Sequence, residues 1–523
     1  MSIPVIDLFA GPGGLGEGFS TLDDYDSDRK FKIVLSIEND TFAHKTLTLR
    51  SFFRQFEPES IPQDYYRFLR GEITIETLFD LWPVQSKRAK REALLAKLGD
   101  DKEAIPDDEL NEKIALALGD NQVWVLIGGP PCQAYSVVGR SRRQDTFLDE
   151  KKDEKVGLYK QYLKILAIHQ PPVFVMENVK GLLSAKTAED RIFSKIISDL
   201  SDPCRSLNNK SNKIKSVNSR PEYSIYSLVR EPRGFDLNDR PIYNPIDFII
   251  QTEKYGIPQT RHRLILLGIR NDINKNLGLL EQRDEISISE VLSGLPKIRS
   301  RLSRIDDSAD NWIRVISQIS NEKILSEIHT DIKTEILKQL DLLKNKRFTT
   351  GGEFINYKNG SVKYNPEWYI DKKIGGVCNH SSRGHMEGDL LRYFFSACFA
   401  RVMNISPKLK DFPKTLLPDH KNIHEGINEQ KFADRFRVQL LNSPSKTITS
   451  HISKDGHYYI HPDSQQCRSF SVREAARIQT FPDNYYFCGP RTSQFTQVGN
   501  AVPPILAKKI AEIVFNLLKI YLP

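Results

Sequence analysis

A cysteine and a glutamate each follow a short apolar run, and their types suggest covalent chemistry on an aromatic ring. Cys132 stands in Gly-Gly-Pro-Pro-Cys-Gln after the run 123–127, and Glu177 directly follows the run 173–176. Glycines and prolines end the first run, so the thiol is presented in a loop. A thiolate that attacks and an acid that protonates the attacked ring together suit addition to a pyrimidine. In the alternative interpretation, Cys132 is a small core residue and Glu177 is an ordinary loop acid.

Apolar runs of strand length alternate with helical segments over the first half of the chain. This alternation predicts an α/β fold with a doubly wound, mostly parallel sheet. The carboxyl ends of its strands meet at one edge, where open α/β sheets bind ligands, so Cys132 and Glu177 should lie at the same edge. The predicted strands are 5–9, 33–37, 123–127, 173–176 and 264–269, with a helix over 158–169.

Size and composition describe a soluble globular chain of more than one domain. The chain has 523 residues, 39% of them hydrophobic and 27% charged, with a net charge of +8. This charge permits a polyanionic partner without demanding one. No run approaches the roughly 20 apolar residues that a membrane span needs, and the first residues lack a basic leader. The six scattered cysteines form no CxxC pair, which suits the reducing cytoplasm.

The spacing of apolar residues changes along the chain and predicts three structural segments. Residues 1–270 read as one domain, with an exposed helical insertion at about 74–122. From 271 to 470 the alternation is lost, and apolar residues every three or four positions over 324–343 predict one amphipathic helix in a second domain. From 471 to 523 regular helix returns, beginning at a Ser-x-x-Glu capping box and ending in an apolar stripe.

A glycine-rich loop follows the first predicted strand and precedes a helix. Gly11, Gly13 and Gly16 fit the G-x-G-x-x-G pattern in its required context, and Glu38 ends the second strand, where an acid can hold ribose hydroxyls. The loop alone does not distinguish NAD, FAD and S-adenosylmethionine, and a structural glycine turn is a further alternative. Methylation of an unreactive aromatic carbon needs a nucleophilic thiol beside a proton-donating acid, whereas hydride transfer does not.

With these residues in place, the chain resembles the cytosine-C5 DNA methyltransferases of the restriction-modification type. The resemblance covers most of residues 1–270 and 466–510, and its six motifs follow the family's order. They are the cofactor motif 7–19, the nucleophile loop 130–136, the acid motif 177–179, the basic strand 255–263, the helix motif 473–482 and the closing motif 497–504.

The resemblance implies S-adenosylmethionine as the cofactor and transfer of its methyl group to C5 of a flipped cytosine. Cys132 would add to C6 of the ring, and Glu177 would hold the N3/N4 edge. Arg261 and Arg263 are the candidate cations that favour the thiolate, with Arg263 also bonding the ring O2. The cofactor would be held by Phe9, Gly11, Gly13, Gly14, Glu38, Asn39, Asn500 and Val502.

The chain departs from the family's pattern near the expected adenine. The family usually has an aspartate in a Gly-Asp-Ile setting, whereas Glu72 stands in the nearest match here. Asn39 stands where a larger side chain often flanks the adenine. No metal site is predicted, because Cys378, His380 and His385 have the spacing of no common zinc pattern.

Double-stranded DNA is the partner that the resemblance implies, in the cytoplasm and at the nucleoid when bound. Residues 271–470 would form the target-recognition domain, seated on the DNA by Thr447–Thr449. A restriction endonuclease acting on the same sequence would be its counterpart, without a stable complex. We expect a monomer with no membrane association.

Three other functions remain alternatives. A tRNA cytosine-C5 methyltransferase would share the fold, although the long segment 271–470 favours DNA. A NAD- or FAD-binding oxidoreductase would use the same glycine loop. A catalytically silent DNA-binding relative is the third, and the presence of Cys132, Glu177 and Arg263 argues against it.

Overall fold

The chain divides into two compact units, each assembled from separate stretches of sequence. Unit 1 comprises Met1–Glu59, Trp82–Asp284 and Ala501–Pro523, and unit 2 comprises Ser60–Leu81 and Glu285–Asn500. The boundaries expected at 270 and 470 differ from this division, since 471–500 groups with unit 2. The computed structural model describes residues 2–23, 29–130, 154–184, 192–208, 221–274, 276–358, 360–418, 423 and 433–522.

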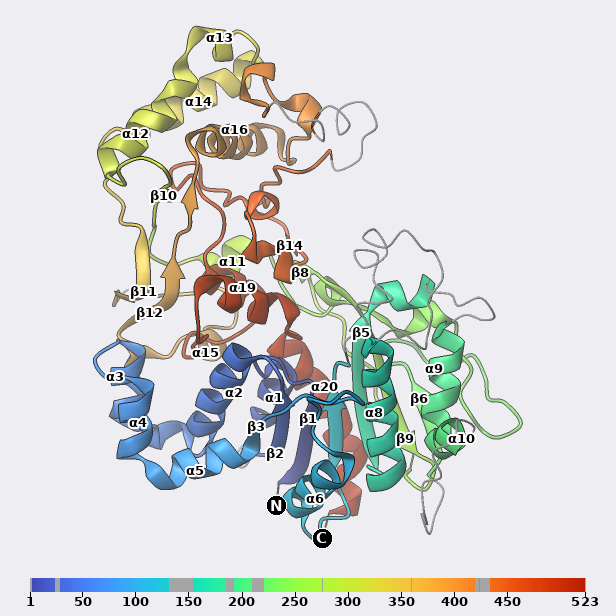
Figure 1. Ribbon diagram of the computed structural model, residues 1–523. Helices are drawn as coiled ribbons and strands as arrows, with labels where there is room; N and C mark the ends of the chain where they lie inside the picture. Colours follow the sequence, from blue (N-terminus) through green and yellow to red (C-terminus); the bar gives the residue numbers. More distant parts are fainter. Residues whose placement is uncertain are drawn as a thin grey trace. The chain divides into compact units, whose positions relative to one another are not determined.

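Unit 1 is built on one sheet that has eight strands among the described residues (Figure 1). Its order is β3-β2-β1-β4-β5-β9-β6, with β7 also paired to β9. The strands are β1 (Ile3–Leu8), β2 (Phe31–Glu38), β3 (Ala93–Leu95), β4 (Val125–Gly128), β5 (Val173–Val179), β6 (Tyr223–Tyr226), β7 (Ile249–Gln251) and β9 (His262–Arg270). The short β8 (Gln259–Thr260) precedes β9.

The sheet is parallel from β3 to β5 and antiparallel around β9. The strand order reverses between β1 and β4, which is the position where open α/β sheets form a ligand crevice at the carboxyl ends of their strands. The predicted mostly parallel sheet is therefore confirmed. The five predicted strands correspond to β1, β2, β4, β5 and β9.

Helices cover both faces of this sheet, as a doubly wound fold requires. On one face, α6, α8, α9 and α10 bury their apolar side chains against β1, β4 and β5. On the other face, α1 and α20 pack on β2, where Phe31 meets Phe19 and Phe515 edge to face. The helices of unit 1 are α1 (Gly14–Ser20), α2 (Thr41–Arg54), α5 (Pro83–Glu92), α6 (Asp107–Leu118), α8 (Glu154–His169), α9 (Ile192–Ser201), α10 (Pro203–Asn208) and α20 (Pro504–Leu518).

The segment expected to be an exposed helical insertion at 74–122 is partly core. Leu110, Ile114 and Leu118 of α6 are buried in the same cluster as the sheet residues. Their spacing of four residues places them on one helix face. Strand β3, within the same segment, pairs with β2 at the sheet edge. The high content of charged residues concealed this narrow apolar stripe.

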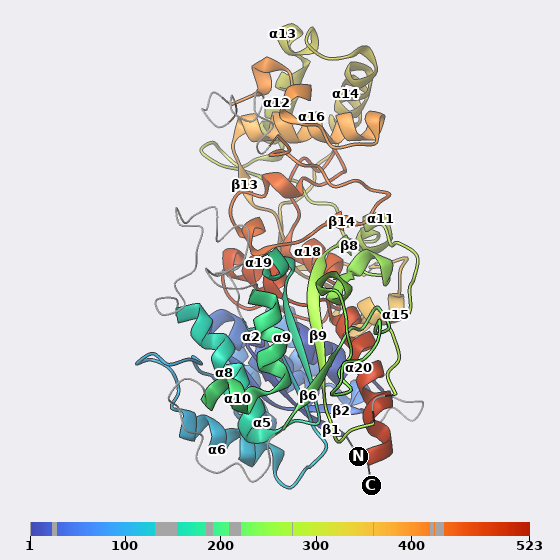
Figure 2. The ribbon, with the colours of Figure 1, turned by 90° about the vertical axis from the view of Figure 1, so that its right-hand side faces the viewer.

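Unit 2 consists of helices, two small sheets and connecting loops, and Figure 2 shows its helices α12, α13, α14 and α16 clustered together. Strands β11 and β12 pair antiparallel, and β10 and β13 pair parallel. Its elements are α3 (Gln63–Leu69), α4 (Ile75–Leu81), α11 (Ile288–Leu292), β10 (Arg301–Leu302), α12 (Ala309–Ser317), α13 (Glu322–Leu325), α14 (Thr330–Leu343), β11 (Gly351–Asn356), α15 (Pro366–Tyr369), β12 (Gly376–Ser381), β13 (Gly384–His385), α16 (Glu387–Met403), β14 (Ser445–Lys446), α18 (Val472–Ile478) and α19 (Arg491–Asn500).

The single helix predicted over 324–343 is two helices in the structure. Helix α13 ends at Leu325 and α14 begins at Thr330, with the His329 side chain accepting a hydrogen bond from the backbone of α14. The apolar spacing continues across the break because both helices bury residues against α16. Among the described residues, none of the helices has the length and apolarity that a membrane crossing requires.

Two buried arginines of α18 organise the centre of unit 2. Arg473 donates to the backbone carbonyls of Cys378, Pro482 and Tyr485 at 2.7–3.0 Å. Arg477 forms a two-pronged ion pair with Asp483. Both side chains are fully buried. The predicted capping box at the start of α18 is present. The arginines of the helix motif 473–482 thus hold together loops that lie far apart in the sequence.

Candidate active site and cofactor site

The backbone of the turn between β1 and α1 has an unusual conformation and leaves open space beside it. Phe9, Gly11 and Gly13 all have positive φ angles, of 56°, 59° and 97°. Glycine adopts such angles freely, whereas Phe9 adopts one at a cost of about 1–2 kcal/mol. No heavy atom lies within 4 Å of the position that a Cβ on Gly11 would take. Strained backbone beside open space is typical of a ligand-binding turn.

The C-terminal part of unit 1 packs directly against this turn. A Cβ on Gly14 would lie 2.3 Å from the carbonyl oxygen of Val502, and a Cβ on Gly18 would lie 2.4 Å from the Cβ of Ala507. Only glycine permits such close packing of α1 on the segment that leads into α20. Val502 therefore lies at the glycine-rich loop. Asn500 ends α19 in unit 2 and is exposed.

Glu38 reaches the same turn from the end of β2. Its carboxylate accepts hydrogen bonds from the backbone N–H groups of Gly11 at 2.7 Å, Asn39 at 2.9 Å and Asp40 at 2.7 Å. Burial raises the pKa of Glu38, and these three donors oppose that rise. The carboxylate is thereby held in one orientation beside the glycine loop, as a ribose-binding acid requires. Asn39 itself is exposed.

Asp7 is a buried acid that sequence reasoning missed. Its side chain is 1% exposed, and neither carboxyl oxygen has a hydrogen-bond partner of ordinary geometry among the described residues. Burial raises the pKa of Asp7 to about 8, although the charge of Arg54 opposes the rise. Burial therefore favours the protonated form of Asp7. The motif Asp-Leu-Phe includes Asp7. However, the apolar residues next to it in the sequence do not indicate whether its carboxyl group is protonated.

The parallel pairing of β4 and β5 sets the geometry of the catalytic edge. Gly128 is the last residue of β4 and pairs with Met176, so Gly129 leaves the sheet beside Glu177, which continues β5 and pairs with Ile265 of β9. A Cβ on Gly129 would lie 3.1 Å from Oε2 of Glu177. Asn178 Nδ2 donates to the carbonyl oxygen of Pro130 at 3.3 Å and ties the loop to β5. Cys132 follows two residues later and lies outside the described residues.

Glu177 pairs with a cation from the neighbouring antiparallel strand. Arg263 on β9 is opposite Val179 of β5, and its Nε lies 3.0 Å from Oε1 of Glu177. Both side chains are largely buried, at 15% and 13% exposure. Burial lowers the pKa of Arg263, and the charge of Glu177 opposes that change. The structure thus brings together two of the four expected catalytic residues.

The other residues predicted from the family motifs have different surroundings. Arg261 is 1% exposed, and its backbone N–H donates to Thr252 Oγ1 at 3.1 Å. Glu72 belongs to unit 2, is exposed and forms ion pairs with Arg70 and Arg67. Glu72 thus has the surroundings of an ordinary surface acid. Its motif also departs from the family's pattern.

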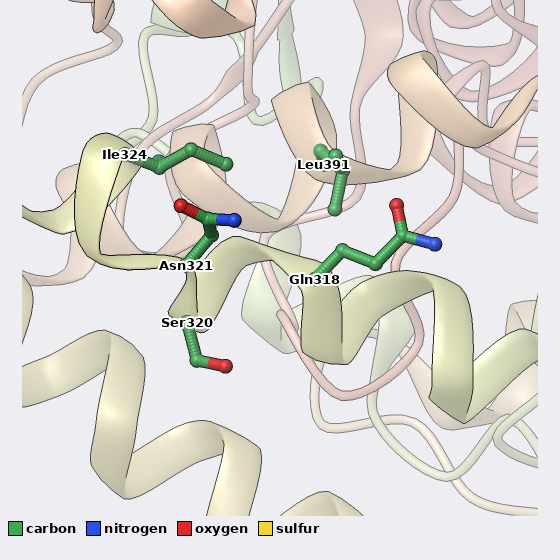
Figure 3. A pocket seen from close by; sticks show the side chains of 5 residues that line it. All are labelled: Gln318, Ser320, Asn321, Ile324 and Leu391. Carbon is green, nitrogen blue, oxygen red and sulfur yellow. The ribbon is translucent and has the colours of Figure 1, made fainter.

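The described residues form neither a metal centre nor a second pocket with catalytic side chains. Within the described part of the chain, no group of three or more His, Cys, Asp or Glu side chains is arranged to hold a metal ion. A hollow of about 460 Å³ lies in the helical cluster of unit 2 (Figure 3). Its lining side chains are Gln318, Ser320, Asn321, Ile324 and Leu391, which carry no acid, base or thiol. The candidate chemistry therefore lies at the sheet edge of unit 1.

Comparison with known proteins identifies a family and several relatives. The sequence matches the family described as C-5 cytosine-specific DNA methylase over residues 101–203 and 243–516. The type II methyltransferase M.Bpa9945I of Bacillus paralicheniformis is 30% identical over 528 residues, covering 98% of each chain. The DNA (cytosine-5-)-methyltransferase M.ApeKI of Aeropyrum pernix is 27% identical over 410 residues, covering 74% of this chain and 80% of its own.

The chain belongs to the C-5 cytosine-specific DNA methylase family. It is a DNA (cytosine-5-)-methyltransferase. This finding confirms the resemblance drawn from the six motifs. It overturns the oxidoreductase alternative and favours DNA over tRNA as the substrate.

Replacing Gly129 by alanine should lower activity because the new methyl group would press on the Glu177 carboxylate. The separation of 3.1 Å requires the carboxylate to move by a few tenths of an ångström. We expect kcat to fall by roughly 10- to 100-fold, since small misplacements of catalytic groups have effects of that size. Gly278→Ala is the control, because open space surrounds that glycine. Equal activity of both variants would contradict this geometry.

Replacing Asp7 by asparagine should stabilise the protein increasingly as pH rises. The folded pKa of about 8 lies above the unfolded value of 3.8, so between these values the unfolded state alone releases the proton. Stability of the native protein falls across that window, whereas the amide of the Asp7→Asn variant does not titrate. From about pH 5 to about pH 7, the difference in unfolding free energy should widen by up to about 3 kcal/mol.

Urea unfolding of both proteins at the two pH values measures this difference. A constant difference would mean that Asp7 is ionised in the folded protein throughout the window.

Proposed function

We propose that the enzyme transfers the methyl group of S-adenosylmethionine to C5 of a cytosine flipped out of a specific duplex DNA sequence. We further propose that it is the modification enzyme of a restriction-modification system. The observation that carries the catalytic part is the Glu177–Arg263 ion pair at the sheet edge where the Cys132 loop begins. The names of the relatives, which are type II methyltransferases, support the second part.

In the proposed mechanism, Cys132 activates the ring by covalent addition. Its thiolate sulfur forms a bond to C6, and the ring electrons move toward C5, which gains carbanion character. Glu177 holds the N3/N4 edge and shares its proton with N3 as charge builds up there. After methylation a base removes the C5 proton, the ring double bond re-forms, and the S–C6 bond breaks to release the thiolate.

Arg263 has two tasks in this mechanism. Its ion pair with Glu177 fixes the carboxyl group against the pyrimidine edge. Its positive charge at a largely buried site also favours an anion nearby, which supports formation of the thiolate and binding of the ring O2. A shift of either side chain would therefore affect both the orientation of the base and the nucleophile.

The turn after β1 fits the proposed cofactor. The open space over Gly11 and the fixed carboxylate of Glu38 would receive the ribose and its neighbours, and Val502 closes the turn from the C-terminal side. Phe9, Gly13, Gly14 and Asn39 belong to the same turn or its border. When bound, S-adenosylmethionine would supply an electrophilic methyl group to C5.

Unit 2 is the proposed reader of DNA sequence. Residues 285–500 contain most of the segment 271–470 that we expect to form the target-recognition domain, with Thr447–Thr449 beside the DNA. A base stacked in a duplex is beyond reach of Cys132 and Glu177, so the cytosine must be flipped into the pocket. Any restriction endonuclease of the system would recognise the same sequence independently.

Glu38→Ala should weaken binding of S-adenosylmethionine because the ribose would lose a charged acceptor. Loss of such hydrogen bonds costs about 1–3 kcal/mol, which corresponds to a fall in affinity of roughly 5- to 150-fold. Isothermal titration calorimetry measures this directly. Glu112→Ala is the matched control, since that acid is exposed on α6 and lies outside the residues proposed to hold the cofactor. Preferential binding of NAD by the native enzyme would overturn the cofactor proposal.

Cys132 should be trapped by DNA that carries 5-fluorocytosine at the methylated position. Fluorine cannot leave as the proton does, so the adduct should persist through denaturation when S-adenosylmethionine is present. Bisulfite sequencing of DNA from expressing cells would first locate the target. Gel electrophoresis then detects the protein–DNA adduct.

Cys132→Ala should abolish both the adduct and methylation. Cys204→Ala should retain both, because that buried cysteine lies on α10. Glu177→Gln should slow methylation severely while leaving the nucleophile, since an amide cannot supply the N3 proton. A Cys132→Ala protein that still methylates C5 would refute the covalent mechanism.

A further inference from the structure

Three arginines from separate stretches of unit 2 lie side by side. Arg301 on β10 pairs across to β13, and its backbone N–H donates to the carbonyl oxygen of Arg383 at 3.1 Å. Arg491, the first residue of α19, donates from Nη1 to the carbonyl oxygen of Ser382 at 2.8 Å. Arg383 therefore stands between the other two. We call Arg301, Arg383, Arg491 and Lys454 the basic strip.

Arg383 is the buried centre of the basic strip. Its side chain is 7% exposed, and its guanidinium donates to the carbonyl oxygens of Ile452 and Lys454 at 2.5 and 2.9 Å. The guanidinium also lies 4.7 Å from the centroid of the Phe495 ring. Its Nε has no hydrogen-bond partner among the described residues. Burial lowers the pKa of Arg383 to about 10, and the charge of Arg491 contributes to that change.

Around this centre the positive charge is largely exposed, and Asp455 and Glu353 are the acids whose charges act on Arg383 and Arg491. Arg301 and Lys454 are exposed, and Arg491 is half-buried. Within the described residues, none of the four cations forms an ion pair with a carboxylate. Burial and the charge of Arg301 lower the pKa of Arg491. Hydrogen bonds to backbone carbonyls thus hold like charges together against their repulsion, which a bound polyanion would relieve.

The basic strip continues into the segment expected to contact DNA. Lys454 follows the short helix η10 (Ser450–Ser453), which begins directly after Thr449. That helix packs on α19, where a Cβ on Gly499 would lie 2.2 Å from the backbone nitrogen of Ser450. Arg491 also stands at the N-terminus of α19, whose helix dipole adds positive potential. Cations and helix dipole therefore favour an anion on one surface.

We infer that Arg301, Arg491 and Lys454 bind backbone phosphates of duplex DNA, with Arg383 as the positioning residue that holds them in place. This inference rests on the proposed function and adds the surface of unit 2 that holds the duplex. Phosphate contacts set the position of a protein on DNA without reading its sequence. The basic strip would therefore strengthen binding to target and non-target duplexes alike.

The salt dependence of affinity tests this inference. Fluorescence anisotropy of labelled duplexes with and without the target sequence would be measured from about 50 to about 300 mM salt. Each of Arg301→Ala and Lys454→Ala should reduce the slope of log K against log salt by about 0.9, because one phosphate contact is lost. Both duplexes should be affected equally, and Arg301→Lys should restore most of the slope.

Lys338→Ala is the matched control, since Lys338 is an exposed cation on α14 and its loss should leave the slope unchanged. An unchanged slope in Arg301→Ala and Lys454→Ala would overturn the inference. Weakened binding of the target duplex alone would also overturn it, because that result describes base reading. A native enzyme that neither binds nor methylates DNA would instead refute the proposed function, so the two failures are distinguishable.

Discussion

The ion pair between Glu177 and Arg263 depends on a change of strand direction in the sheet. Strands β4 and β5 run parallel and bring the Pro130 loop and Glu177 to one edge, whereas β9 runs antiparallel and begins at that edge. A parallel strand in the place of β9 would present its last residues there instead of its first. The antiparallel pairing therefore allows a cation at the start of one strand to meet an acid near the end of its neighbour.

Unit 2 depends on arginine in a different way. Arg473, Arg477 and Arg383 all donate to backbone carbonyls of loops that lie far apart in sequence. A guanidinium offers five donors in a fixed plane, so one side chain can satisfy several buried carbonyls at once. Buried carbonyls without donors would be costly, and irregular loops cannot satisfy them as regular strands do. In this unit, arginine side chains provide backbone carbonyls with the hydrogen-bond donors that regular secondary structure would otherwise supply.

Much of unit 1 could be predicted from the sequence because its strands are continuous apolar runs bounded by glycine and proline. The pairing of β5 with β9 was harder to predict, since periodicity does not give strand direction. The many charged residues of α6 concealed its place in the core. The break between α13 and α14 at Ser326–His329 could not be predicted because the apolar spacing continues across it. The raised pKa of Asp7 follows from burial, which no local pattern reveals.

The contact of Gly14 and Gly18 with the segment 501–507 has a consequence for biosynthesis. The ribosome makes the glycine turn several hundred residues before it makes the segment that covers the turn. In that interval the face of α1 that packs on α20 lacks its partner. The turn and its covering segment can therefore reach their final packing only after both stretches of chain have left the ribosome.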